Sequence, residues 1–217
     1  LVIICHLGNP GLADDLIKDV LKMVASLAGS RHKPLLLITG HEDVVPGPPE
    51  AIVIRTPNYG ADIVPYFIGL NYLARRGIEP DYILKMHTKG DEPTMLAMVD
   101  AFAHGLDKQL DAMDAHPEYD IAGSKYLIMP NFHVHDLLGR KYANPGMQFV
   151  AGSSFLARYG TQKSILTQHA ILVKQAMFLG QYISGWMFDK NSPTHALERI
   201  IGGFESQARQ LKMVSAN

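Results

Sequence analysis

The residues best suited to chemistry stand together in the segment Asp81–Lys89, which reads DYILKMHTK. Its apolar and aromatic residues are typical of a buried strand. The strand runs into a polar tip of four cationic or hydrogen-bonding residues, Lys85, His87, Thr88 and Lys89. In an open α/β sheet, ligands bind at the carboxyl ends of the strands, and Lys and His side chains there suit a phosphate group. The segment therefore predicts a phosphate site, with a plain strand that ends in a solvated turn as the alternative.

A second polar segment, Asn58–Asp62, follows a predicted strand and opens a predicted helix. Gly60 allows the backbone to approach a ligand closely or to adopt a positive φ. Asp62 is placed either to cap the helix or to bind a ribose hydroxyl, a sugar hydroxyl or a metal ion. Both hypotheses stay open on the residues alone.

Two further segments carry small or polar residues where a ligand would fit. Ala151–Ser154 interrupts a predicted strand with glycine and serine, which marks either a plain bulge or a ligand close to the backbone. No G-x-S-x-G turn is present, so a serine hydrolase has little support. His195 and Glu198 lie three residues apart on one face of a predicted helix. One of them would act as base or metal ligand while the other orients it, or both belong to a solvated first turn.

The composition excludes several classes of function. The 217 residues include 20 basic and 21 acidic side chains, which leaves no bulk electrostatic attraction for nucleic acid. Neither G-x-G-x-x-G nor G-x-x-x-x-G-K-[ST] occurs, so dinucleotide oxidoreductases and P-loop NTPases lose their main signature. No apolar run has the length of a membrane span, and the lone Cys5 favours a reducing compartment. We therefore expect a cytoplasmic protein that neither binds nucleic acid nor spans a membrane.

The elements that must position these residues alternate between strand and helix, which predicts an α/β fold with a largely parallel sheet. A chain of this length is expected to form one domain, residues 1–217. The predicted strands are Leu1–Cys5, Pro34–Gly40, Ala51–Arg55, Asp81–Lys89, Tyr119–Gly123 and a sixth made of Gln148–Ala151 and Phe155–Ala157 with a polar break between them. The predicted helices are Leu12–Leu27, Asp62–Arg76 with Gly77 as its stop, Met95–Met113, Gln162–Leu179 and Thr194–Gln207.

Three blocks of residues, taken in order, resemble the rhamnan synthesis F family of glycosyltransferases. The first is Asn58–Phe67, where an asparagine, a glycine and an aspartate precede a proline and two aromatic residues. The second is Asp81–Lys89, similar to the family's strand that ends in K-x-H-T-K. The third combines Ala151–Arg158 with His195–Arg199. The blocks span nearly the whole chain, which departs from the family where serines instead of bulky residues follow the glycine of the third block.

This resemblance implies a single Rossmann-like domain of the GT-A type, with a central, mostly parallel sheet of about six or more strands flanked by helices. It implies a hexosyltransferase that moves a hexose, with rhamnose suggested, from a nucleotide-diphosphate sugar of the UDP or dTDP type to a glycan acceptor in polysaccharide or glycoprotein glycan synthesis. Residues 1–92 would bind the nucleotide sugar and residues 93–217 the acceptor. The alternative is a catalytically degenerate module of the same fold that binds a glycan or a nucleotide.

Each candidate residue has an expected role under this resemblance. The donor nucleotide would be bound at strand ends by His6, Gly8, Asn9, Thr39, Gly40, Thr56, Asn58, Gly60 and Asp62. The diphosphate would contact Lys85, His87, Thr88 and Lys89. The sugar would lie against Gly152, Ser153 and Ser154, and the acceptor against the loop that carries Trp186.

The expected catalytic base is Glu198, with Asp189 second, if the reaction inverts the anomeric centre. A retaining reaction needs no such base. Because the departing phosphate develops negative charge, either Lys89 or a divalent ion such as Mn²⁺ or Mg²⁺ must compensate it. Many GT-A enzymes carry an aspartate-x-aspartate motif after this strand, and the ligands expected in its place are His87, Asp91 and His195.

Overall fold

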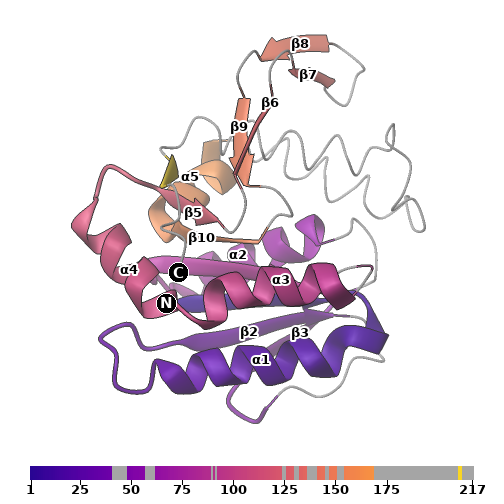
Figure 1. The fold of residues 1–217 in the computed structure, drawn as a ribbon, viewed down its shortest axis with the longest axis vertical. Coiled ribbons are helices and arrows are strands. Elements are labelled where there is room, and N and C mark those ends of the chain that lie inside the picture. Colours follow the sequence, from indigo (N-terminus) through magenta and orange to yellow (C-terminus); the bar gives the residue numbers. More distant parts are fainter. Residues whose placement is uncertain are drawn as a thin grey trace.

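The computed structural model describes residues 1–40, 48–56, 62–88, 90, 92–123, 126–129, 132–135, 141–144, 147–150, 154–168 and 210–211. Its centre is a seven-stranded sheet with the strand order β11-β5-β10-β4-β1-β2-β3 (Figure 1). The strands are β1 (Val2–Leu7), β2 (Leu35–Gly40), β3 (Ile52–Arg55), β4 (Tyr82–His87), β5 (Ile121–Gly123), β10 (Phe155–Arg158) and the two-residue β11 (Gln210–Leu211). The predicted α/β fold with a mostly parallel sheet is confirmed.

Four strands at one side of the sheet, β3, β2, β1 and β4, run parallel to one another. Strand β10 is antiparallel to both of its neighbours, β4 and β5. In β1, His6 lies opposite Thr39 of β2 and opposite His87 of β4. The carboxyl ends of these three strands therefore lie side by side at one edge of the sheet.

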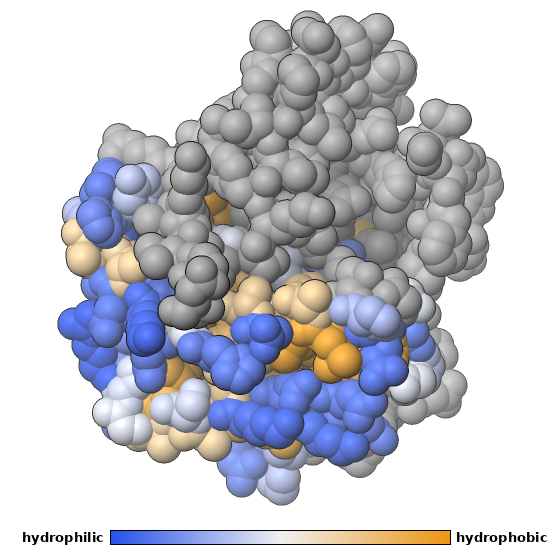
Figure 2. All heavy atoms as spheres, in the orientation of Figure 1, coloured by the Kyte–Doolittle hydropathy of each residue, from blue (hydrophilic) through white to orange (hydrophobic). Residues whose placement is uncertain are grey.

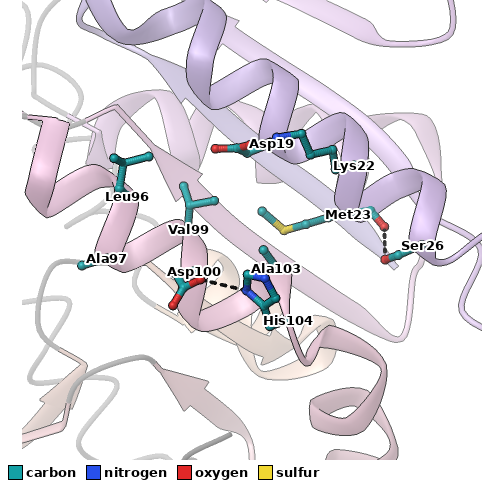
Figure 3. Close-up of a pocket in the computed structure, with 10 residues that line it drawn as sticks. All are labelled: Asp19, Lys22, Met23, Ser26, Leu96, Ala97, Val99, Asp100, Ala103 and His104. Carbon is teal, nitrogen blue, oxygen red and sulfur yellow. Dashed lines mark hydrogen bonds and ion pairs between the residues drawn. The ribbon is translucent and has the colours of Figure 1, made fainter. Parts of the chain in front are cut away.

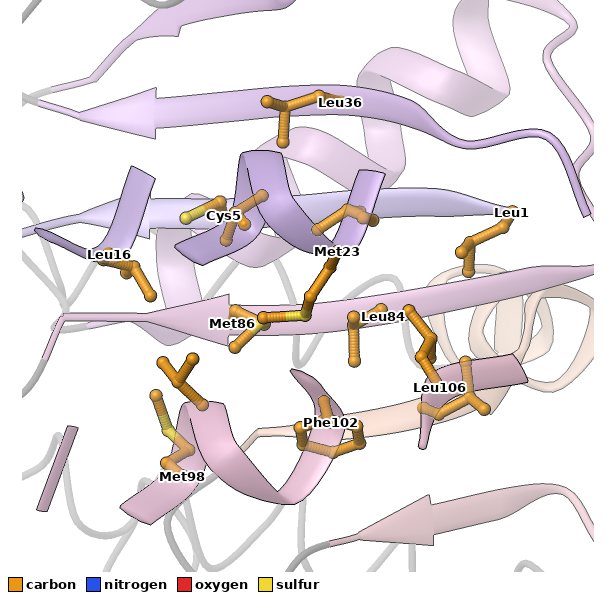
Figure 4. Close-up of a cluster of buried hydrophobic side chains, with 14 of the residues drawn as sticks. Leu1, Cys5, Leu16, Met23, Leu36, Leu84, Met86, Met98, Phe102 and Leu106 are labelled. Atoms are coloured by element: carbon orange, nitrogen blue, oxygen red, sulfur yellow. The ribbon is translucent and has the colours of Figure 1, made fainter. Parts of the chain in front are cut away.

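The helices cover both faces of the sheet (Figure 1). On one face, α1 (Ala13–Ser26), α3 (Glu92–Ala103) and α4 (Leu106–Ala115) pack against a cluster that includes Ile3, Cys5 and Leu84 (Figure 4). On the other face, α2 (Ile63–Arg76) and the first residue of α5 (Tyr159–Gln168) pack against Ile4 and Ile83. Burial raises the pKa of the Cys5 thiol to about 12, so this cysteine stays protonated as a core residue.

Alternation along the strands assigns each side chain to one of these faces. In β1, Val2 and Ile4 belong to the core under α2, so His6 continues the same row. In β4, Ile83 belongs to that core too, and Lys85 and His87 follow it at two-residue spacing. Polar residues thus replace apolar ones on the α2 face where the two central strands end.

Two glycines explain how closely α2 packs on the sheet and where the helix ends. A Cβ at Gly69 would lie 3.1 Å from Cγ2 of Ile4, so glycine lets the helix approach β1 closely. Gly77 ends the helix with a left-handed φ of 63°, and its N–H bonds to carbonyls of the last turn, as a C-terminal glycine does. The predicted stop at Gly77 is confirmed.

Two predicted elements are wrong in detail. The single helix predicted over Met95–Met113 is two helices, α3 and α4, because the chain turns at His104–Gly105, where Gly105 N–H donates to Phe102 O at 3.4 Å. The predicted sixth strand is two separate strands. β9 (Met147–Val150) pairs with β6 (Tyr126–Met129) outside the main sheet, whereas β10 belongs to it.

The remaining described elements are the short η1 helix (Pro10–Leu12) and a second ribbon of β7 (Phe132–His135) and β8 (Lys141–Asn144). The predicted helix from Gln162 starts earlier, at Tyr159, and its part after Gln168 lies outside the described residues, as does the predicted helix Thr194–Gln207. None of the described helices combines the length and the apolar character that a membrane crossing needs.

Candidate functional site

The order of the strands creates a switch point between β1 and β4. The chain moves outward from β1 through β2 to β3, and then returns to place β4 on the other side of β1. In open α/β sheets, ligands bind in the crevice outside the carboxyl ends of the strands at such a point. Here those ends carry His6 and His87.

Five polar residues gather at this point, and we call them the switch-point cluster: His6, Thr39, Asp62, Lys85 and His87. Asp62 precedes the first turn of α2. Its side chain makes no capping hydrogen bond to that helix. Instead, Oδ2 of Asp62 accepts a hydrogen bond from Nζ of Lys85 and lies 3.5 Å from Nε2 of His87. The side chain of Asp62 therefore does not cap the helix, and its role in binding a hydroxyl or a metal ion stays a prediction.

Lys85 is a buried cation with only 3% of its surface exposed. Its Nζ lies 5.6 Å from the ring centroid of Tyr66 and 5.8 Å from that of Phe155. Both distances fall within the range of a cation–π interaction. Tyr66 in turn donates a hydrogen bond of 2.8 Å to Oε1 of Gln162. The charge of Lys85 is therefore balanced by Asp62 and enclosed by aromatic rings.

His6 is a buried histidine whose Nδ1 faces Thr39. Its Nδ1 lies 3.2 Å from the carbonyl oxygen of Thr39 and 3.2 Å from Thr39 Oγ1. A carbonyl oxygen only accepts, so this contact favours a proton on Nδ1, whereas the hydroxyl fits either tautomer. Burial lowers the pKa of His6 to about 4, against an opposing effect of the Asp62 charge, while the charge of Lys85 lowers it further. The ring is therefore uncharged near neutral pH.

Thr88 joins the loop after β1 to the tip of β4. Its Oγ1 accepts hydrogen bonds from the backbone N–H of Gly8 at 2.9 Å and of Asn9 at 2.8 Å. Its own N–H donates to the carbonyl of His6 at 3.0 Å, and its carbonyl lies 2.9 Å from Nδ1 of His87. Gly8 and Asn9 were predicted to bind the nucleotide, and their backbone N–H groups are engaged with Thr88.

Three other described candidates, Gly40, Thr56 and Ser154, do not belong to the switch-point cluster. Gly40 and Thr56 sit at the ends of β2 and β3, where Thr56 N–H donates to Gly40 O at 2.7 Å. The buried Oγ1 of Thr56 has no hydrogen-bond partner within the described ranges. Ser154 is buried, and its Oγ lies 2.6 Å from Sδ of Met98. Since Met98 belongs to the core on the α3 face, the Ser154 hydroxyl lies on the opposite face from the switch-point cluster.

Ten candidate residues lie outside the described residues, and their roles stay predictions: Asn58, Gly60, Lys89, Asp91, Gly152, Ser153, Trp186, Asp189, His195 and Glu198. The aromatic enclosure of Lys85 was not predicted from the sequence. One signal for it existed, because Tyr66 follows Asp62 by four residues and such residues share one helix face. No comparable signal links Phe155 or Gln162 to Lys85.

A second cluster holds ligand atoms close enough to bind a metal ion, at the opposite end of β4. His32, Asp111 and Asp114 each place one such atom within 4.8 Å of the others. The side chain of Arg31 lies against this group, with Nη2 3.1 Å from Asp111 and 2.6 Å from Asp114. Tyr82 donates a hydrogen bond of 2.5 Å to Asp114. The Arg31 guanidinium thus already supplies positive charge to the two carboxylates.

A surface hollow of about 640 Å³ lies between α1 and α3, away from the carboxyl ends of the strands. Met23, Leu96 and Val99 form its apolar lining, and Asp100 pairs with His104 at its rim (Figure 3). Figure 2 shows apolar surface between these two helices, flanked by polar residues. The hollow contains none of the predicted site residues.

Comparison of the chain with protein-family models found no match, and comparison with curated proteins found none either. The resemblance to the rhamnan synthesis F family therefore stays a prediction.

Proposed function

We propose that the protein is a glycosyltransferase that moves a hexose from a nucleotide-diphosphate sugar to a glycan acceptor in polysaccharide or glycoprotein glycan synthesis. The observation that carries the proposal is the switch-point cluster, a set of buried polar side chains at the position where open α/β sheets bind nucleotides. The resemblance of three sequence blocks to the rhamnan synthesis F family supports it and suggests rhamnose as the sugar.

In this proposal the nucleoside lies across the ends of β1 and β2, near His6 and Thr39. The carboxylate of Asp62 accepts a hydrogen bond from a ribose hydroxyl, and Lys85 holds that carboxylate in place. Since Lys85 and Asp62 neutralise each other, the diphosphate needs a further cation. Lys89 or a divalent ion such as Mn²⁺ would supply it, with His87, Asp91 and His195 as the proposed ligands of the ion.

The chemical step depends on residues of the proposed acceptor half. If the reaction inverts the anomeric centre, Glu198 takes the proton of the acceptor hydroxyl, with Asp189 as the second choice. If the reaction retains the configuration, Glu198 binds sugar or supports the fold. In either case the cation at the diphosphate stabilises the negative charge that develops on the leaving group.

The test is a thermal-shift panel of UDP, GDP, CMP and dTDP, each with and without Mn²⁺. A ligand that binds only the folded state stabilises it by about 2.7 kcal/mol at a hundred times its dissociation constant. We expect one nucleotide to raise the midpoint clearly above the other three, and Mn²⁺ to increase the shift if a metal binds at the diphosphate. The triphosphates UTP, GTP and dTTP are measured beside their diphosphates. Absence of any shift, or a larger shift with a triphosphate than with its diphosphate, would refute the proposal.

A second candidate function is a binding module without chemistry. It is favoured by the internal neutralisation of Lys85 by Asp62 and by the Ser154 hydroxyl, which lies on the far face of the sheet. Release of nucleotide from a nucleotide sugar in the presence of Mn²⁺ would decide for the transferase. Saturable binding of the same compound without any turnover would decide for the module.

A further inference from the structure

The second cluster, His32, Asp111 and Asp114, has a chemistry that the proposed function does not use. His32 lies in the loop between α1 and β2, whereas the two aspartates belong to α4. They stand three residues apart and therefore share one face of that helix. One ligand atom of each residue lies within 4.8 Å of the other two. An imidazole nitrogen and two carboxylate oxygens are a donor set that suits Zn²⁺.

Nε2 of His32 faces an acceptor and a donor at the same time. It lies 2.9 Å from Oδ2 of Asp114, and Nε of Arg31 donates a hydrogen bond to it at 3.3 Å. A proton on Nε2 suits the carboxylate but opposes the guanidinium, whereas a lone pair suits the guanidinium but opposes the carboxylate. The residue is only 8% exposed, so water relieves little of this conflict. A metal ion between Nε2 and Oδ2 removes it, because both atoms then present lone pairs to the ion.

Arg31 supplies the positive charge that such an ion would supply. Its Nη2 lies 3.1 Å from Oδ1 of Asp111 and 2.6 Å from Oδ2 of Asp114. The Arg31 side chain is 64% exposed, so it can turn into solvent when the carboxylates take another cation. The guanidinium and a metal ion therefore compete for the same oxygens.

A second layer of hydrogen bonds orients the Asp114 carboxylate. Tyr82 donates a hydrogen bond of 2.5 Å to Oδ1 of Asp114, and the Tyr82 hydroxyl accepts one of 3.1 Å from Nη1 of Arg158. Arg158 is held in turn, because its Nε donates to the carbonyl of Tyr119 at 2.8 Å. Oδ1 of Asp114 is thus engaged, and Oδ2 is turned toward His32. Outer partners of this kind fix the orientation of metal ligands.

We infer that His32, Asp111 and Asp114 bind a divalent transition-metal ion such as Zn²⁺, and that Arg31 competes with the ion. Three protein ligands leave a coordination position for water. Mg²⁺ prefers oxygen ligands, so it binds here more weakly than Zn²⁺. The ion joins the loop after α1 to α4 at the start of β4, whereas the switch point lies at the carboxyl end of that strand.

The experiment is isothermal titration calorimetry of the nucleotide-free protein with Zn²⁺, and separately with Mg²⁺. Wild type is compared with Asp111→Asn, His32→Gln and Arg31→Ala. Asp111 is 69% exposed, so its amide variant is expected to fold like wild type. Asp107→Asn, one turn earlier on the exposed face of α4, is the matched control. Circular dichroism and urea unfolding without metal establish that each variant is folded.

We expect Asp111→Asn and His32→Gln to weaken the binding of Zn²⁺ at least about tenfold, since even outer partners of a metal site contribute that much. Arg31→Ala should strengthen it by about two- to tenfold, because the ion no longer has to displace two exposed ion pairs. A set of side chains that forms only a structural ion-pair network would not gain metal affinity when its arginine is removed. The control should bind Zn²⁺ as wild type does.

Three results would overturn the inference. The first is a wild type that does not bind Zn²⁺, or binds Mg²⁺ as tightly. The second is an unchanged Zn²⁺ affinity in Asp111→Asn, which would place the ion at other histidines. The third is an Arg31→Ala variant that binds Zn²⁺ no more tightly than wild type. Since no nucleotide is present, none of these results bears on the proposed function.

Discussion

The depressed pKa of His6 predicts how the stability of the protein depends on pH. The folded state holds His6 at a pKa of about 4, below its ordinary value of 6.5, chiefly because the ring is buried. As the pH falls below 6.5, the unfolded chain binds a proton that the folded protein does not. The free energy of unfolding therefore decreases between pH 6.5 and pH 4, and His6 contributes no further loss below pH 4.

The size of the effect follows from the shift. A difference of one pH unit between the two pKa values corresponds to about 1.36 kcal/mol, so a shift from 6.5 to about 4 corresponds to about 3 kcal/mol. Above pH 6.5 this stability is fully present. Within the window, the free energy of unfolding changes by up to about 1.4 kcal/mol per pH unit on account of His6 alone.

The assay is urea unfolding followed by circular dichroism at half-unit steps from pH 4 to pH 7.5. Nine other histidines share the window, so wild type is compared with His6→Phe, in which those groups are unchanged. We expect the free energy of unfolding of wild type to fall more steeply with decreasing pH than that of His6→Phe, by up to about 1.4 kcal/mol per pH unit, the slope that one bound proton gives. Above pH 6.5 the two curves should run parallel. Curves that are parallel over the whole range would refute the assignment of His6 as a buried neutral side chain.

The other predictions concern the ion pair, the loop contact and the end of α2. Lys85→Met should reduce the free energy of unfolding by about 3–5 kcal/mol because the mostly buried Asp62 carboxylate loses the charge of Lys85. Adding Asp62→Leu should restore part of the loss in urea unfolding, and no restoration would mean that the two side chains are not coupled. Thr88→Val should reduce stability by about 1–3 kcal/mol, because two N–H groups of the loop after β1 lose their acceptor, whereas Thr161→Val on α5 is the control with a single partner. Gly77→Ala should lower stability by about 1–2 kcal/mol, since alanine resists the left-handed conformation; an unchanged thermal midpoint would contradict this.

The central strands and the meeting of polar residues at their carboxyl ends were predictable from the sequence because both depend on local patterns. Apolar runs marked β1, β2 and β4, and parallel strands bring their carboxyl ends to one edge. Side chains two residues apart in a strand point to the same face of the sheet, so His6 and His87 lie on the α2 face with Ile4 and Ile83. The pattern also placed Asp62 at the start of α2, directly after a strand and a turn.

The partners within the site were not predictable, because they depend on packing between distant segments. The sequence offered Lys85 as a phosphate ligand, whereas the structure pairs it with Asp62 between the rings of Tyr66 and Phe155. That arrangement depends on how α2 and the antiparallel β10 lie on the sheet. For the same reason the predicted sixth strand was wrong, since periodicity does not tell which sheet a short strand joins.

The charge balance between Lys85 and Asp62 also separates the two candidate functions. These two side chains form an ion pair, and His6 beside them is uncharged. A nucleoside gains hydrogen bonds there, whereas a diphosphate gains no net attraction from an ion pair that is already balanced. The ratio of the affinities of UDP and uridine, measured with and without Mn²⁺, therefore reports any cation beyond Lys85. A ratio well above one fits a transferase that stabilises its leaving group, and a ratio near one under both conditions fits a module that binds the nucleoside alone.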